Sequence, residues 1–179
     1  KTLWIAASAV LLATLWYGWS VNGGDISYGR LNKIPWQEVQ WYHAAAPAIL
    51  VALTRIGVPV STSFLVLSVF ASTFILEKML MKSIMGYGVA AAFAYMVWFA
   101  IHKYAGKWFD ETKPVSENHK RAWRIAQWFA TGGLWWTWLS HDMANIAVFL
   151  PRVIPVDLMI MISVVFVAGL FFMFRERGG

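Results

Sequence analysis

The sequence predicts an all-α integral membrane protein, and three observations support that prediction. Only 24 of the 179 residues are charged, 15 basic and 9 acidic, while 59% are hydrophobic and the mean hydropathy is +0.56. The charged residues are confined to short segments, so apolar runs long enough to cross a bilayer remain between them. The alternation of apolar and polar residues that is typical of a membrane β-barrel is absent from these runs. We therefore expect one integral membrane domain, residues 1–179, in contact with a lipid bilayer.

The same composition argues against other classes of protein. A soluble enzyme of this size needs far more polar surface, and a disordered chain needs low hydrophobicity. The sequence has no Cys, which excludes a disulfide framework, a thiolate zinc site and a Cys nucleophile. It also lacks the GxSxG, HExxH and GxxxxGKS/T motifs. We therefore expect no enzymatic activity, no metal site, no bound cofactor and no nucleic-acid partner.

The apolar runs predict a polytopic bundle of about six transmembrane helices, some of them broken or re-entrant. The four runs without Lys, Arg, Asp or Glu are residues 2–24, 56–76, 83–101 and 158–174. Two shorter candidates are residues 39–54, interrupted by His43, and residues 125–149, interrupted by His141 and Asp142. The first run is predicted as a retained helix rather than a signal peptide, because it stays apolar to Val21 and lacks a clear cleavage site. Residues 22–25 and 149–155 are predicted as interhelical turns.

One polar segment predicts the orientation of the chain. Six of the fifteen basic residues lie within residues 103–124, which contain only three acidic residues. Such an excess of Lys and Arg favours the cytoplasmic side of a membrane, so we expect a basic cytoplasmic loop at about 103–124. Counting six crossings outward then places both termini in the cytoplasm. The expected location is a plasma membrane, which in a bacterium is the inner membrane.

The first break in the membrane pattern lies between residues 55 and 63. Gly57 and Pro59 are expected to stop the helix that precedes them, and Ser61 or Thr62 is placed to cap the helix that follows. A helix start with free N–H groups and neighbouring hydroxyls can bind an anion. The alternative is a tight turn between two helices with an ordinary cap.

The second break lies within the apolar run 125–149. An Asp at such a place is costly, and it usually faces protein, water or an ion. Asp142 and Asn145 are three residues apart, so both side chains can share one helical face. Carboxylate and amide oxygens suit a hard cation such as Na⁺, and His141 could titrate or tune the site. The alternative is a polar clamp between helices.

These two breaks carry the resemblance of the chain to a known family. Residues 57–63, GVPVSTS, resemble the G-[LIV]-P-V-S-T-T-H signature of the inorganic phosphate transporter (PiT) family. Residues 141–145, HDMAN, are similar to the N-D-V-A-N signature of that family. The family implies a plasma-membrane symporter of inorganic phosphate, or another small anion, with Na⁺ or H⁺ as the coupling ion.

The resemblance also implies roles for individual residues. Ser61, Thr62 and Ser63 would donate hydroxyl and N–H groups to phosphate, while Asp142 and Asn145 would contact the cation or the phosphate. The sequence departs from the signatures at Phe64, where the family has His, and at His141, where it has Asn. The family has two copies of each motif and this sequence has one, so a homodimer or a larger membrane complex would have to complete the site.

Two functions therefore remain open. The first is a secondary transporter, or a protein derived from one, with a polar site at the two broken helices. The second is a non-transporting accessory or structural subunit of a larger membrane complex, in which Gly- and Ala-rich helix faces pack closely against other chains.

Overall fold

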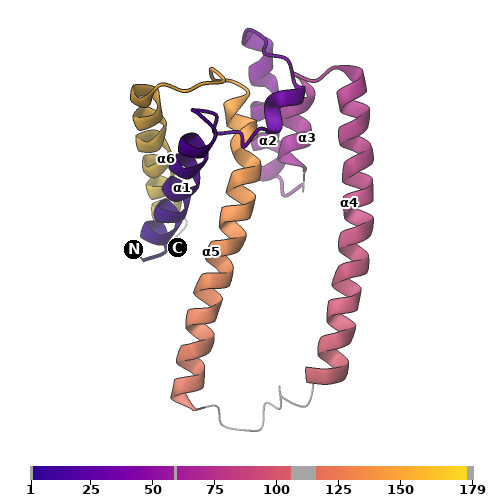
Figure 1. Ribbon diagram of the computed structural model, residues 1–179, viewed down its shortest axis with the longest axis vertical. Helices are drawn as coiled ribbons and strands as arrows, with labels where there is room; N and C mark the ends of the chain where they lie inside the picture. The colour runs from indigo at the N-terminus through magenta and orange to yellow at the C-terminus, as the bar shows by residue number, and fades with distance from the viewer. Residues whose placement is uncertain (1, 59, 106–115, 177–179) are drawn as a thin grey trace. The chain divides into compact units, whose positions relative to one another are not determined.

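The computed structural model describes residues 2–58, 60–105 and 116–176, and in these residues the chain is helical without any strand (Figure 1). The predicted all-α fold class is confirmed. The elements are α1 (Thr2–Val21), η1 (Arg30–Lys33), η2 (Trp41–Ala44), α2 (Ala45–Arg55), α3 (Thr62–Ser68), α4 (Thr73–Ala100), η3 (Ile101–Ala105), α5 (Glu117–Ala147) and α6 (Val156–Glu176). Of the short elements, η1 and η2 are 3-10 helices and η3 is a π-helical turn.

In the part of the chain that the structure describes, three stretches of helix are long and apolar enough to cross a membrane: Thr2–Val21, Thr73–Tyr104 and Val156–Glu176. They correspond to the charge-free runs 2–24, 83–101 and 158–174, so these three runs are confirmed as apolar helices. The shorter candidate 39–54 contains α2, whose 11 residues span only about 16 Å, roughly half a hydrocarbon core. The described residues thus support an all-helical protein with three candidate spans, and six crossings are not confirmed.

The prediction of one helix across residues 56–76 is wrong. The chain leaves α3 after Ser68, turns through residues 69–72 and enters α4 at Thr73. Phe70 explains the turn, because its side chain is buried against the rings of His43 and Phe149. The Gln37 side-chain amide also donates to the Phe70 carbonyl, at 2.9 Å. These contacts hold Phe70 in the core, where a continuous helix would not have placed it.

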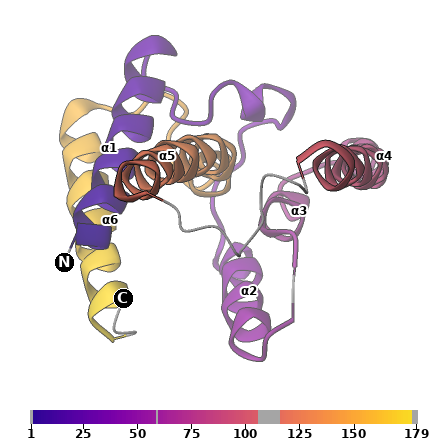
Figure 2. The same cartoon turned by 90° about the horizontal axis from the view of Figure 1, so that it is seen from below.

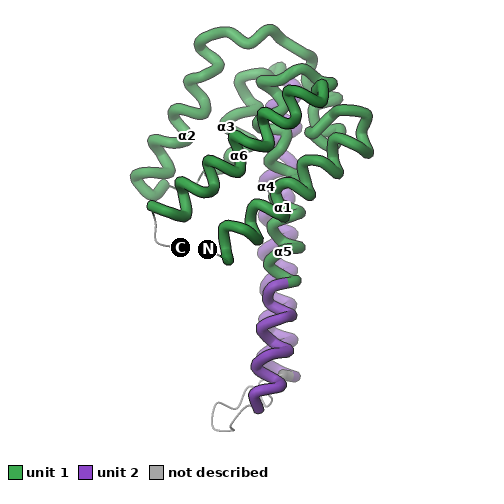
Figure 3. The backbone as a smooth tube through the Cα atoms, turned by 90° about the vertical axis from the view of Figure 1, so that its left-hand side faces the viewer, with its two compact units in different colours: residues 1–72, 129–179 green, residues 73–128 purple. Residues whose placement is uncertain are grey.

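The chain divides into two compact units, which are coloured separately in Figure 3. Unit 1 comprises residues 1–72 and 129–179, and unit 2 comprises residues 73–128. The helix α5 contributes its first part to unit 2 and its second part to unit 1.

In unit 1, α1 lies along α6 (Figures 1 and 2). Indole N–H groups of α1 tie the two helices together: Trp4 donates to the Val167 carbonyl at 3.3 Å, and Trp16 donates to Ser163 Oγ at 3.1 Å. Both helices are among the candidate spans, where such interhelical hydrogen bonds replace those that water would make.

The two predicted turns of unit 1 are confirmed, and a backbone hydrogen bond joins them. Residues 22–24 form the turn after α1, and Gly24 accepts a hydrogen bond from the Ile154 N–H at 3.0 Å. Arg152, in the turn between α5 and α6, donates to the Ile34 carbonyl at 2.8 Å. Arg152 therefore fastens residues 22–35 to the turn between α5 and α6.

In unit 2, no described side chain of α4 is buried, although the helix is strongly apolar. The helix α5 begins at Glu117 with Ser116 before it, whose Oγ accepts the His119 N–H at 3.4 Å. Residues 117–124 of the predicted basic loop are therefore helical. Residues 106–115 of that loop, like Pro59 of the first break, lie outside the described residues.

Candidate functional site

The first break is built as the sequence predicts. The helix α2 ends at Arg55, and Gly57 follows with φ of 79°, a left-handed conformation that favours glycine. The N–H groups of Gly57 and Val58 donate to the carbonyls of Thr54 and Leu53, at 3.1 and 3.0 Å. This pair of bonds is the Schellman motif, which satisfies the last carbonyls of a helix. The predicted helix stop at Gly57 is confirmed.

The predicted cap at Ser61 is also confirmed. Ser61 is the N-cap residue of α3, and its Oγ accepts the N–H of Phe64 at 3.4 Å. That N–H is therefore already occupied, and α3 has only seven residues, which limits the dipole at its start. Thr62 and Ser63 are half-buried and Ser61 is exposed. The break is firmly capped, and the cap alone does not make an anion site.

The predicted break within residues 125–149 is wrong, because α5 runs without interruption from Glu117 to Ala147. Asp142 and Asn145 do share one face of this continuous helix, as their spacing predicts. Asn145 Nδ2 donates to Asp142 Oδ1 at 3.2 Å. A carboxylate only accepts, so this bond fixes the orientation of the amide and leaves Asn145 Oδ1 as a second acceptor. The Asn145 side chain is buried, and its Oδ1 has no partner among the described residues. An acceptor of this kind is satisfied by a cation or by a hydrogen-bond donor.

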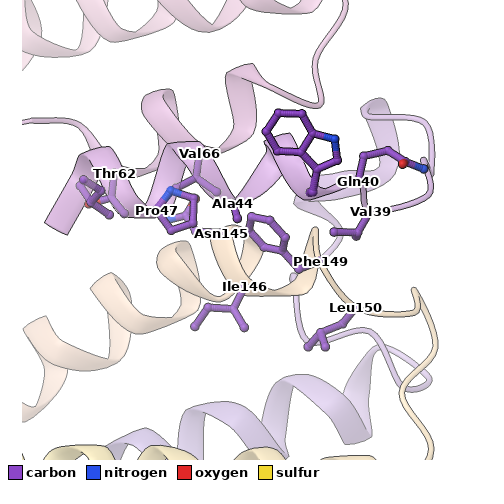
Figure 4. Close-up of a pocket in the computed structure, with 12 residues that line it drawn as sticks. Val39, Gln40, Ala44, Pro47, Thr62, Val66, Asn145, Ile146, Phe149 and Leu150 are labelled. Carbon is purple, nitrogen blue, oxygen red and sulfur yellow. The ribbon is translucent and has the colours of Figure 1, made fainter. Parts of the chain in front are cut away.

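Residues of the two motifs meet at one pocket of about 660 Å³ in unit 1 (Figure 4). Thr62 of α3 and Asn145 of α5 both line it, although they are 83 positions apart in the sequence. The other lining residues are Val39, Gln40, Trp41, Ala44, Pro47, Leu50, Val66, Ile146, Phe149 and Leu150. None of these side chains is charged, so the pocket is apolar apart from the amides, the Thr62 hydroxyl and one indole N–H. Ser61, Ser63, His141 and Asp142 do not line it.

One residue of the site, Arg30, was not predicted from the sequence. Arg30 lies in η1, and its Nη2 donates a hydrogen bond to Nε2 of His141. The imidazole can accept that bond only when it is neutral, with its own proton on Nδ1. Partial burial lowers the pKa of the Arg30 guanidinium, while the negative charge of Asp142 raises it. A costly Asp within an apolar run implies a counter-charge, but fifteen basic residues are candidates and no spacing selects Arg30.

The oxygens of Asp142 and Asn145 are of the kind that suits a hard cation. Within residues 2–58, 60–105 and 116–176, no three His, Asp or Glu side chains gather in a group that could hold a metal ion. Asp142 and Asn145 offer one carboxylate and one amide oxygen, and other groups would have to complete the coordination of any ion held there.

No family model, no curated protein and no solved structure matches this chain. The resemblance to the PiT family therefore depends on the two short motifs alone. The described residues define the class, an all-helical protein in which three helices are long and apolar enough to cross a membrane.

The contact between Arg30 and His141 is expected to depend on pH. Protonation of the ring would remove the acceptor and bring two cations together, and the other charge acting on the ring is that of Asp142. We expect Arg30→Ala to lower the free energy of unfolding by about 1 kcal/mol at pH 8, where the ring is neutral. At pH 5 the substitution should be neutral or stabilising. Unfolding of the purified protein in mixed micelles at both pH values measures the difference.

Two further variants control this experiment. His141→Gln keeps a side-chain acceptor that does not titrate, so in this background the effect of Arg30→Ala should be the same at both pH values. Arg55→Ala removes an exposed Arg from the end of α2 in the same unit and should show no dependence on pH. An equal cost of Arg30→Ala at pH 8 and pH 5 in the native background would contradict the prediction.

Proposed function

We propose that the chain is a secondary transporter, or a protein derived from one, with its site between the two motifs. The observation that supports this proposal best is that Thr62 and Asn145 line one pocket. A pair of motifs that recurred by chance in two apolar segments would have no reason to converge. A transporter site is built where polar groups from separate helices meet, and Thr62 at the start of α3 and Asn145 on the continuous helix α5 meet in this way.

In this proposal, Asp142 and Asn145 hold the coupling cation. Asp142 contributes a carboxylate, and the Asn145 amide is already oriented so that its oxygen remains an acceptor. Na⁺ is the coupling ion that these oxygens suit best, and H⁺ bound by Asp142 is the other possibility that the resemblance implies. His141, at the start of the motif, tunes the site through its contact with Arg30.

The proposed substrate is inorganic phosphate or another small anion, which Ser61, Thr62 and Ser63 would contact. Hydroxyl groups at the start of α3 can donate to an oxyanion, and Thr62 already lines the pocket. Because the chain has one copy of each motif, a second copy or a partner chain would supply the remaining ligands. The protein would act in a plasma membrane with both termini in the cytoplasm.

Uptake by proteoliposomes tests the proposal. We expect the reconstituted protein to accumulate labelled phosphate when an inward gradient of Na⁺, or of H⁺, is imposed. Asp142→Asn should abolish the gradient-dependent uptake, because it removes the charge that holds the cation. Asp157→Asn is the matched control, since Asp157 lies in the first turn of α6 and outside the pocket. No uptake by the native protein in either gradient, or undiminished uptake by Asp142→Asn, would contradict the proposal.

The accessory-subunit function is supported by a different observation. No described residue of α4 is buried and most are exposed, so most of the apolar surface of this helix can contact lipid or another chain. A subunit of a larger complex would use such a helix for contacts with its partners. Purification from the native membrane distinguishes the two functions: partner chains in a fixed ratio, together with the absence of uptake by the isolated protein, favour the subunit.

A further inference from the structure

We propose that Arg30 is a tethered counter-ion of Asp142. The Arg30 guanidinium stays near the Asp142 carboxylate while the coupling cation is absent, and it thereby sets the affinity of the site for that cation. This inference rests on the proposed cation site. It adds a residue that lies outside both motifs and that determines how tightly the site binds Na⁺.

The tether is the contact with His141. Arg30 belongs to η1, and η1 follows a turn that Asp25 holds in place by accepting the Ser27 N–H at 2.7 Å and the Gly29 N–H at 3.2 Å. From this base the guanidinium reaches α5 and donates to His141 Nε2, next to Asp142 in the sequence. The side chain of a residue so held has less freedom to move away from the carboxylate.

Arg30 and Asp142 affect one another without forming a direct ion pair. Among the described residues, the only ion pair closer than 4 Å joins Lys120 to Glu117 in unit 2. The charged atoms of Arg30 and Asp142 are therefore further apart than that. Asp142 Oδ1 instead accepts Asn145 Nδ2, while the charge of Asp142 raises the pKa of the Arg30 guanidinium. The carboxylate thus has a cation nearby and still has oxygen sites that a small ion can occupy.

The consequence follows from the electrostatics of two cations that share one carboxylate. A Na⁺ ion that binds Asp142 must enter the positive potential of Arg30, and this repulsion weakens its binding. Removal of the guanidinium charge should therefore tighten Na⁺ binding. Damage to the structure would have the opposite effect, so the direction of the change separates a tethered counter-ion from a merely structural residue.

The experiment measures the melting temperature of the full chain in detergent as NaCl replaces choline chloride at constant ionic strength, which holds the screening of charges fixed. A ligand that binds the folded state raises the melting temperature, and the half-saturating concentration reports its affinity. In Arg30→Gln we expect that concentration to fall by about tenfold relative to the native protein, as loss of about 1.4 kcal/mol of repulsion would produce. Arg30→Lys keeps the charge and should restore the native value.

Two controls make the result specific. Arg55→Gln removes a cation of the same unit from the end of α2 and should leave the Na⁺ dependence unchanged. Asp142→Asn combined with Arg30→Gln should abolish the stabilisation by Na⁺, because the carboxylate that binds the ion is gone.

The outcomes separate this inference from the proposed function. A half-saturating concentration that is unchanged or higher in Arg30→Gln overturns the inference, as does the absence of Na⁺ stabilisation in both the native protein and Arg30→Gln. Tighter Na⁺ binding by Arg30→Gln in a protein that takes up no phosphate supports the inference and overturns the transport proposal. Phosphate uptake by the native protein, together with an Na⁺ affinity that is unchanged in Arg30→Gln, supports the transport proposal and overturns the inference.

Discussion

Phe70→Ala is expected to lower the free energy of unfolding of the protein by about 3–5 kcal/mol, the largest change we expect from a single substitution. Phe70 is 1% exposed and lies in the turn between α3 and α4. Its ring centroid is 4.3 Å from that of His43 and 5.1 Å from that of Phe149. Truncation removes these contacts and leaves a cavity, while the hydrogen bond from Gln37 to the Phe70 carbonyl remains possible.

Unfolding in mixed micelles, followed by the near-UV circular dichroism of the tryptophans, measures this change. Phe129→Ala is the matched control, because Phe129 is 79% exposed on α5 and belongs to the same unit. Its truncation should cost less than about 1 kcal/mol. A similar cost for the two substitutions would show that Phe70 does not hold the turn in the way the contacts indicate.

The charge-free runs predicted α1, α6 and the greater part of α4, because a long run without charges leaves few alternatives to a helix in a membrane. The same criterion failed at residues 56–76. Phe70 is apolar like much of the run, and its contacts with His43 and Phe149, together with the Gln37 hydrogen bond to its carbonyl, hold the turn between α3 and α4. The absence of charges does not reveal a break that depends on tertiary contacts.

The predicted basic loop shows a second limit of the charge pattern. Residues 117–124 begin α5, and Lys120 forms an ion pair with Glu117 at 2.8 Å, one helical turn away. Charged residues that are spaced three or four apart stabilise a helix as readily as they occupy a loop. Net charge therefore indicated a polar segment at 103–124 without deciding its secondary structure.

The local features of the candidate site were predictable from the sequence. That residues of the two motifs line the same pocket was not predictable. Gly57 and Ser61 act through their own backbone, and Asp142 and Asn145 act through the period of one helix, so each pair is visible in the sequence. That Thr62 reaches the same pocket as Asn145 depends on how α2 and α3 pack beside α5. The contact of Arg30 with His141 spans 111 positions, and no local pattern encodes it.

The second large effect is expected at Gly18, where α1 and the chain that follows it touch. A Cβ atom at this position would lie 2.6 Å from Cε2 and 2.7 Å from Cζ of the Tyr28 ring. The ring is held there by the Tyr28 hydroxyl, which donates to the Thr14 carbonyl at 2.5 Å. Gly18→Ala should therefore displace Tyr28 and lower the free energy of unfolding by about 1–3 kcal/mol.

Gly132→Ala provides a control of opposite sign. Gly132 lies within α5, and nothing stands within 4 Å of the place where its Cβ would be. Replacing a helical Gly by Ala without a clash should stabilise the protein by about 0.5–1 kcal/mol. A double-mutant cycle then assigns the cost of Gly18→Ala to its cause, because in a Tyr28→Ala background the methyl group meets no ring and the cost should disappear. If the cost persists there, the helix α1 itself is sensitive to the methyl group, and the close approach of Tyr28 is not what requires glycine at this position.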